Sequence, residues 1–237
     1  MGRKKTPEAD IALLLEGTYP YVRGGVSGWV YELISGLPEY SFSLVFLGAT
    51  KDSVGAIRYE LPDNVVSLSS HYLMEPWDLK PGRWRRGNAH CFADAYALHE
   101  SFRAADAGFD EKVLGRVLGC LGKNGQLGPK DFFFSEASWD SICNSYTKFA
   151  AGASFIDYFW TVRNMHSALF KLADIAHEVA PARAFHTVST GYAGFLGALF
   201  HNLTGRPLIV TEHGIYTKER KIDLQAAYIQ DSRNILA

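Results

Sequence analysis

Short apolar runs alternate along this chain with stretches whose apolar residues recur at helical spacing, and this alternation restricts the fold more than any other feature. Ile11–Leu15 is a continuous apolar run, which is typical of a strand buried on both faces of a parallel sheet. After a loop at 16–25 that is rich in glycine, proline and tyrosine, an apolar stripe over 26–37 predicts a helix that Pro38 ends. Phe42–Leu47 predicts the next strand, so the first part of the chain indicates a βαβ unit.

The later part of the chain repeats this alternation. Val65–Leu68 predicts a weaker third strand. The remaining predicted elements are a helix over 162–179 that Pro181 ends, a strand over 184–188, a helix over 192–203 and a strand over 208–211. Strands that alternate with helices favour a parallel sheet with helices on both faces, so the predicted fold class is α/β.

Between about residues 72 and 157 the strand pattern disappears, and we expect an irregular, mostly helical insertion. Its segment Leu79–Gly87 carries several basic residues beside Trp77 and Trp84. This segment is either an interaction patch or a solvated basic loop with two packed tryptophans, and short charge runs favour the loop. The basic residues are Lys80, Arg83, Arg85 and Arg86.

Two carboxylates of the insertion lie in aromatic surroundings, Glu136 beside Ser135, and Asp157. A pair of carboxylates can hydrolyse a glycosidic bond when the two groups face each other across it. The sequence does not place these two side by side, and packed structural residues are the preferred interpretation.

Composition and charge exclude several classes of protein. The chain has 237 residues, of which 47% are hydrophobic and 21% charged, as in folded globular proteins. A net charge of -1 provides no overall field that would attract nucleic acid or an anionic membrane, so we expect no nucleic-acid partner. The run Ile11–Leu15 is too short for a secretion signal or for a membrane span of about 20 residues.

The cysteines and the end of the chain carry two further expectations. Cys91, Cys120 and Cys143 are odd in number and widely spaced, without a CxxC pair. This pattern argues against a disulfide framework and against a zinc site, and it favours a reducing cytosol. The chain stops at Ala237 inside a helix predicted to begin near Glu219, with no helix-ending residue, so we expect the natural chain to continue.

Three segments are predicted to form a functional rim, because ligands of parallel α/β sheets lie beyond the carboxyl ends of the strands. These segments are 16–25, 186–191 and 212–217. In the first, Arg23–Gly28 joins a strand to a helix, so unhindered backbone amides and the positive end of the helix meet at one point. The segment is either a diphosphate site or a sharp turn that needs glycine.

Other nucleotide-binding motifs are missing. The chain has no GxxxxGK[ST] motif, and the spacing of Gly24, Gly25 and Gly28 is not GxGxxG. A dinucleotide-binding fold also expects an acidic residue at the end of the second strand, where this chain has Gly48 and, further on, Asp52. A nucleoside triphosphatase and a dinucleotide enzyme are therefore both disfavoured.

Two histidines belong to the rim segments. His213, between Glu212 and Gly214, is expected to point into the cleft, where it can donate to a sugar hydroxyl or to a phosphate. His186 either contacts a ligand or, as preferred, is buried and hydrogen-bonded to a neighbouring loop. The other histidines form no HExxH motif and no cluster with carboxylates, so we predict no metal site.

Taken together, four motifs resemble the cytosolic glycosyltransferases of bacterial Pel exopolysaccharide synthesis, members of glycosyltransferase family 4. The motifs are Glu16–Pro20, Arg23–Ser27, His186–Tyr192 and Thr211–Arg220, and the resemblance covers nearly the whole chain. It implies a GT-B architecture of two Rossmann-like domains, of which residues 1–237 would be the N-terminal one. It also implies a UDP-sugar donor, retention of anomeric configuration, and a hexosamine-rich, cationic polysaccharide acceptor.

The resemblance assigns roles to particular residues. Gly24 and Gly25 map onto the loop that meets the donor diphosphate and the acceptor, and His213 maps onto the catalytic histidine near the donor sugar. The same motifs make Tyr19, Arg23, His186, Ser189, Gly191 and Glu212 candidates for substrate binding. The resemblance implies no cofactor and no metal.

The family's second domain supplies charges that this chain lacks. The Arg and Lys that neutralise the leaving diphosphate and an ExxxxxxxE pattern do not follow Arg220, so we expect the isolated chain to fold without catalysing transfer. A different class of function remains open, in which residues 72–157 dock onto inner-membrane proteins of the Pel secretion complex and hold the protein peripherally at that membrane. A third hypothesis is a dinucleotide enzyme that uses the same glycine loop.

Overall fold

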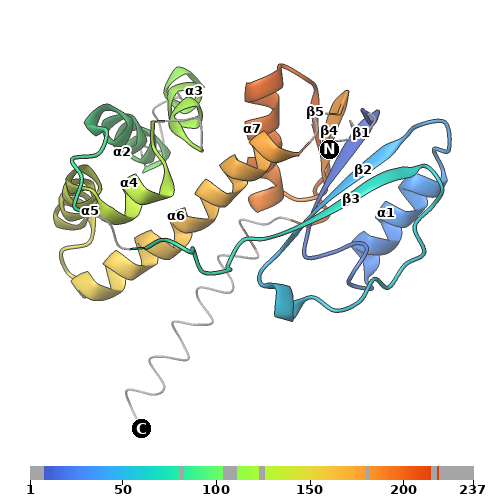
Figure 1. Ribbon diagram of the computed structural model, residues 1–237, viewed down its shortest axis with the longest axis horizontal. Helices are drawn as coiled ribbons and strands as arrows, with labels where there is room; N and C mark the ends of the chain where they lie inside the picture. The colour runs from blue at the N-terminus through green and yellow to red at the C-terminus, as the bar shows by residue number, and fades with distance from the viewer. Residues whose placement is uncertain are drawn as a thin grey trace, which may run out of the picture.

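The predicted α/β sheet is present. The computed structural model describes residues 8–80, 83–103, 111–122, 126–179, 182–214 and 218. All neighbouring strands of its five-stranded sheet pair in parallel, in the order β3-β2-β1-β4-β5 (Figure 1). The strands are β1 (Ile11–Glu16), β2 (Phe42–Gly48), β3 (Val65–Tyr72), β4 (Ala184–Thr187) and β5 (Leu208–Val210).

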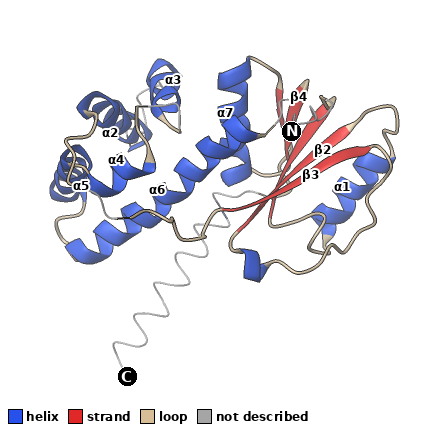
Figure 2. Ribbon diagram, viewed as in Figure 1, coloured by secondary structure: helices blue, strands red, loops and turns tan. Residues whose placement is uncertain are grey.

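Helices cover both faces of this sheet, because successive side chains of a strand point to opposite sides. Leu13 and Leu15 of β1 pack with α1 (Gly25–Ser35) in one core cluster. Ala12 and Leu14 pack in a second cluster with α6 (Phe155–Glu178) and α7 (Tyr192–Thr204). Figure 2 shows the strands as one layer between α1 and the pair α6 and α7. The continuous apolar run predicted a strand buried on both faces, and that prediction is confirmed.

The insertion is helical, as predicted, and forms a separate layer beyond α6 (Figure 1). Its helices are α2 (Ala89–Arg103), α3 (Glu111–Cys120), α4 (Pro129–Phe134) and α5 (Glu136–Phe149). The α6 helix begins at Phe155, inside the expected limits of the insertion, and runs from its far end back to the sheet.

The expectation about the cysteines was wrong for one pair. Cys91 of α2 and Cys120 at the end of α3 form a disulfide, with their Cα atoms 6.1 Å apart, while Cys143 is free. The two cysteines are 29 residues apart in sequence and share no local motif. They meet because α2 packs against α3, a tertiary contact that cysteine spacing does not encode.

Two smaller differences concern element bounds and tryptophans. The third strand reaches Tyr72 rather than Leu68. Trp77 is packed and donates to the Ser167 hydroxyl at 2.7 Å, whereas Trp84 is 63% exposed and is not the packed residue we expected. The short 3₁₀ helix η1 (Lys51–Ser53) follows β2.

No helix within the described ranges is long and apolar enough to cross a membrane. The helix predicted from Glu219 and the rim residues 215–217 lie outside the described residues.

Candidate functional site

The strand order places the candidate site between β1 and β4. Chain order runs from β1 towards β3 on one side of β1, and resumes with β4 and β5 on the other side. Such a reversal opens a crevice at the carboxyl ends of the two strands, where ligands of doubly wound sheets bind. The loop after β1 carries the glycines, and the loop after β4 carries Ser189–Gly191. The sheet therefore brings two of the predicted rim segments to one crevice.

Gly24 and Gly25, at the start of α1, are not explained by turning or by packing. Gly24 has a φ of 172°, which is extended backbone open to any residue, and Gly25 already lies in the helix. A Cβ atom added to either glycine would have no atom of the protein within 4 Å. The loop's positive φ belongs to Gly17 instead, at 61°. The missing side chains leave free space above the backbone, on the outside of the protein.

The amino end of α1 is also open electrostatically. Gly24 offers no side-chain cap, and the first turn of α1 contains no acidic residue. Unpaired amides and the positive end of the helix dipole favour an anion at such a position. Arg23, just before the glycines, is exposed and makes no ion pair with any described residue.

The other helix end at this crevice is already occupied by a carboxylate of the protein. Glu16, at the end of β1, accepts a hydrogen bond from the backbone N–H of Ala193 in the first turn of α7, at 3.1 Å. A Cβ atom on Gly191 would lie 2.7 Å from the Glu16 Oε2 atom. Gly191, a predicted substrate-binding residue, thus makes room for Glu16. Of the two helix ends, α1 is the one left for an external anion.

Trp29 on α1 brings together the two rim histidines. Its ring centroid lies 4.7 Å from that of His213 and 6.0 Å from that of His186, both edge-on. The His186 Nε2 atom is 2.8 Å from the Thr211 Oγ1 atom, so β4 is tied to the segment after β5. His213 is exposed, while His186 is 8% exposed, as the preferred interpretation expected. Burial, and then the neighbouring His213, lower the pKa of His186.

Sequence reasoning missed Trp29. The apolar stripe over 26–37 includes Trp29 as a packing residue of the predicted helix, and Trp29 is half-buried. Its position within two helical turns of Gly24 is the signal that was available, because an aromatic ring at the edge of the stripe faces the carboxyl ends of the strands.

The other predicted binding residues are placed differently. Tyr19 is fully buried in the α1 core cluster, its ring 5.0 Å from that of Tyr59, and burial raises its pKa to about 12. It presents no surface to a ligand. Ser189 has a buried hydroxyl with no hydrogen-bond partner among the described residues. Glu212 is exposed and accepts a hydrogen bond from the Thr190 hydroxyl at 2.7 Å.

The remaining candidates of the insertion have helix-capping or surface roles. Glu136 and Asp157 are exposed in the first turns of α5 and α6. Ser135, next to Glu136, is buried and caps α5 by accepting from the Ser138 N–H. Arg85 pairs with Asp131 at 3.1 Å. In the part of the chain that is described, no three His, Cys, Asp or Glu side chains gather in a way that would hold a metal ion.

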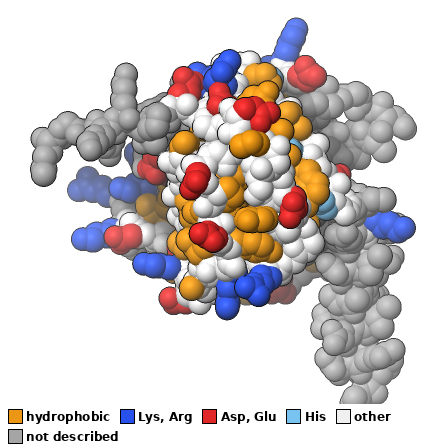
Figure 3. Space-filling model, turned by 90° about the vertical axis from the view of Figure 1, so that its right-hand side faces the viewer, with side chains coloured by type: hydrophobic (Ala, Val, Ile, Leu, Met, Phe, Trp, Pro, Cys, Tyr) orange, Lys and Arg blue, Asp and Glu red, His pale blue; other side chains and the backbone are white. Residues whose placement is uncertain are grey.

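The surface around α1 carries no field of one sign. Figure 3 shows this side of the molecule, where acidic and basic side chains are scattered among apolar ones. An anion at the crevice would therefore be held by local amides and by Arg23 rather than by the whole surface.

Comparisons with known proteins give a family and no closer relative. Searches of curated proteins and of solved structures find no match. One family model matches residues 9–236, which include every strand and helix described above. The chain therefore belongs to the DUF3492 family, which is described as a domain of unknown function.

Proposed function

We propose that this chain is the N-terminal domain of a retaining glycosyltransferase of the PelF type, which transfers sugar from a UDP-sugar to a growing exopolysaccharide. One observation carries the proposal: glycines that neither the turn nor the packing requires lie at the open end of α1, the helix whose Trp29 contacts His213. Backbone that leaves room for an external group at a positive helix end suits a diphosphate.

Each rim group then has a defined role. The amides of Gly24 and Gly25 meet the diphosphate, and the exposed Arg23, which forms no ion pair with a described residue, adds a positive charge. His213, held against Trp29, donates to the sugar. The charges that stabilise the departing UDP come from a second domain, so the isolated chain binds weakly and does not turn over. We place the whole enzyme in the cytoplasm, peripheral to the inner membrane through its partners.

A titration of the ¹⁵N-labelled chain with UDP tests the proposal. We expect the backbone amide signals of Gly24, Gly25 and Val26 to shift, together with that of His213, because these groups border the same crevice. A dissociation constant in the millimolar range is expected, because only a few hydrogen bonds and one positive charge hold UDP. Amide shifts report the site as well as the affinity.

Two further titrations separate the alternatives. NAD is expected to bind no more tightly than UDP, because β2 ends at Gly48 and the first acidic residue after it is the exposed Asp52 in η1. Tight NAD binding at the glycine loop would replace the transferase proposal with a dinucleotide enzyme. Shifts confined to residues outside the crevice would refute both.

A docking function is the second candidate, and the end of the insertion together with the start of α6 supplies the observation that favours it. Ile156 and Trp160 on α6 are 67% and 55% exposed, and Trp139 on α5 is 43% exposed. Trp139 lies within 6 Å of Phe155 and Phe159, with ring centroids 5.8 and 5.9 Å away. Exposed apolar side chains that gather on one part of a surface mark interaction sites.

Replacing Ile156 and Trp160 with serine tests this second candidate. If the insertion docks onto membrane proteins, the double variant is expected to co-sediment with membranes of the source cell at least about threefold less than the native chain, because apolar contacts dominate such interfaces. Gly25→Ala serves as the matched control and is expected to sediment like the native chain. Equal sedimentation of all three proteins would argue against docking through this surface.

A further inference from the structure

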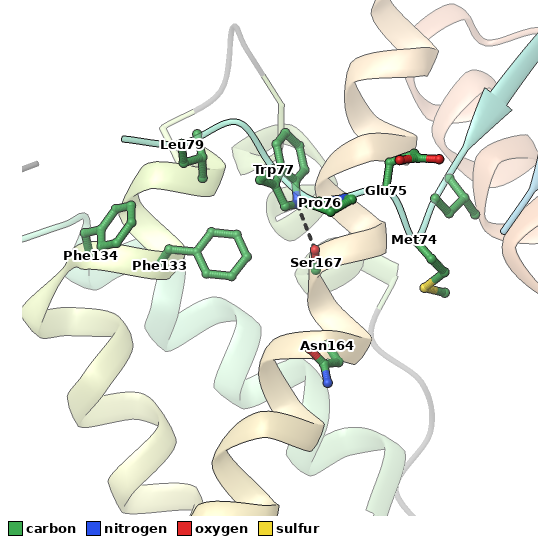
Figure 4. A pocket seen from close by; sticks show the side chains of 10 residues that line it. Met74, Glu75, Pro76, Trp77, Leu79, Phe133, Phe134, Asn164 and Ser167 are labelled. Atoms are coloured by element: carbon green, nitrogen blue, oxygen red, sulfur yellow. Dashed lines mark hydrogen bonds between the residues drawn. The ribbon is translucent and has the colours of Figure 1, made fainter. Parts of the chain in front are cut away.

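A second concave site lies in the insertion, away from the β1–β4 crevice. A pocket of about 540 Å³ opens between the segment after β3, the end of α4 and the middle of α6 (Figure 4). Its walls are mainly aromatic and apolar, and two polar side chains from α6 take part. The lining residues used below are Leu73, Glu75, Trp77, Phe133, Asn164 and Ser167.

Two of the aromatic walls are held in place from behind. The indole N–H of Trp77 donates to the Ser167 hydroxyl at 2.7 Å, and the Lys171 Nζ atom lies 5.4 Å from the centre of its ring. Phe133 is fixed by Arg163, whose guanidinium lies 4.6 Å from the ring and donates to the Phe133 carbonyl at 3.0 Å. Cations stacked on aromatic rings restrict their orientation. The rings are therefore fixed surfaces rather than mobile side chains.

The two cations behind these walls, Lys171 and Arg163, do not line the pocket. The Lys171 ammonium group donates hydrogen bonds to the backbone carbonyls of Tyr72 and Glu75. Glu75 also lines the pocket, and its carboxylate accepts a hydrogen bond from the Lys51 N–H at 2.7 Å. Burial lowers the pKa of both Lys171 and Arg163. A ligand of this pocket meets aromatic faces, the neutral side chains of Asn164 and Ser167, and one carboxylate, that of Glu75.

Those neutral groups are available for hydrogen bonding. Asn164 and Ser167 are three residues apart on α6 and therefore lie on one face of the helix. The exposed Asn164 amide has no hydrogen-bond partner among the described residues. The Ser167 hydroxyl accepts from Trp77 and keeps its own proton to donate. The amide of Asn164 offers both donors and an acceptor.

The pocket is connected to the rim by direct contacts. The Leu73 N–H donates to the carbonyl of Gly48 at the end of β2, at 2.9 Å. The Tyr21 hydroxyl, in the glycine loop, lies 2.8 Å from the Ser70 hydroxyl of β3. The segment that lines the pocket thus begins at the same carboxyl edge of the sheet as the glycine loop.

We propose that this pocket binds an uncharged saccharide chain, with sugar rings stacked on Trp77 and Phe133 and hydroxyl groups bonded to Asn164 and Ser167. The C–H faces of a sugar ring are weakly positive and match the negative face of an aromatic ring, while its hydroxyls bond to donors and acceptors such as the Asn164 amide and the Ser167 hydroxyl. An apolar peptide would leave the Asn164 amide without a partner, which costs affinity. The proposal does not rest on nucleotide binding at the β1–β4 crevice.

Titration of the ¹⁵N-labelled chain with maltohexaose, cellohexaose and chitohexaose, without nucleotide, tests the proposal. At least one of these uncharged hexasaccharides is expected to shift the amide signals of 73–79 and of Asn164 at millimolar concentration. Trp77→Ala is expected to weaken that binding about tenfold, and Asn164→Ala about fivefold through the loss of one hydrogen bond. Because Asn164 is exposed, its replacement is expected to leave the fold intact. Urea unfolding of both variants checks that each one is folded.

Met165→Ala is the matched control. Met165 is 60% exposed on the same helix, one position from Asn164 and turned away from the pocket, so its loss leaves saccharide affinity unchanged. Absence of shifts with all three hexasaccharides would overturn the proposal and favour a protein partner for this surface. Binding that Trp77→Ala and Asn164→Ala leave unchanged would also overturn it, since the saccharide would then lie elsewhere. Both results are independent of the UDP titration, which tests the β1–β4 crevice.

Discussion

Replacing Gly25 with alanine is expected to weaken UDP binding about tenfold and to leave the free energy of unfolding unchanged or raise it by up to about 1 kcal/mol. The two effects have opposite signs because the position has no packing role. An added Cβ atom meets nothing within 4 Å, and alanine favours the helix that begins at this residue. The same methyl group occupies the space in which a diphosphate approaches the amides. Amide titration and urea unfolding of the two proteins measure the two quantities.

Gly119→Ala is the control for this experiment. Gly119 lies exposed in α3, its added Cβ atom would also meet nothing within 4 Å, and it is remote from the crevice. The variant is expected to gain similar helix stability and to keep the UDP affinity of the native chain. A Gly25→Ala protein that unfolds more easily, or that binds UDP as the native chain does, would mean that the glycine serves the turn.

Replacing Phe185 with alanine is expected to lower the free energy of unfolding by about 3–5 kcal/mol, a typical cost of removing a buried aromatic ring. Phe185 is fully buried on β4 and stacks on Phe200 of α7, with ring centroids 4.5 Å apart and an interplanar angle of 7°. Loss of the ring leaves a cavity between the sheet and α7. Urea unfolding monitored by circular dichroism gives the difference.

Trp160→Ala removes a ring of comparable size that is 55% exposed, and its cost is expected to stay below about 1 kcal/mol. The comparison separates burial from aromatic character. A Phe185→Ala protein that loses less than about 1 kcal/mol would show that α7 closes over the vacated space.

Much of the sheet could be predicted because its signals are local. The run Ile11–Leu15 and the helical stripe after it are short-range patterns, and the structure places β1 and α1 where they indicated. The second part of β3 escaped prediction because Ser69, Ser70 and His71 are polar. They form a strand by pairing with β2, whose residues are distant in sequence. Tertiary pairing overrode the weak local preference.

The candidate site was predicted at the level of segments and not of contacts. The carboxyl ends of the strands located the rim, since that rule depends on topology alone. Trp29 beside His213, and Glu16 beside Gly191, arise from how the helices sit on the sheet. Tyr19 looked available because it belongs to the glycine loop, yet its ring fills the core. A sequence motif records which residues occur together and not which way each side chain points.

The bond between Glu16 and Ala193 has a consequence for how this protein folds. The two residues are 177 positions apart, and the whole insertion lies between them. The central strand β1 can pair with β2 early, but it gains β4 and the capped α7 only after the insertion has been made. Contacts of such long separation close slowly. During synthesis on the ribosome, the segments of α2–α5 therefore emerge before β4, the strand that pairs with the second edge of β1.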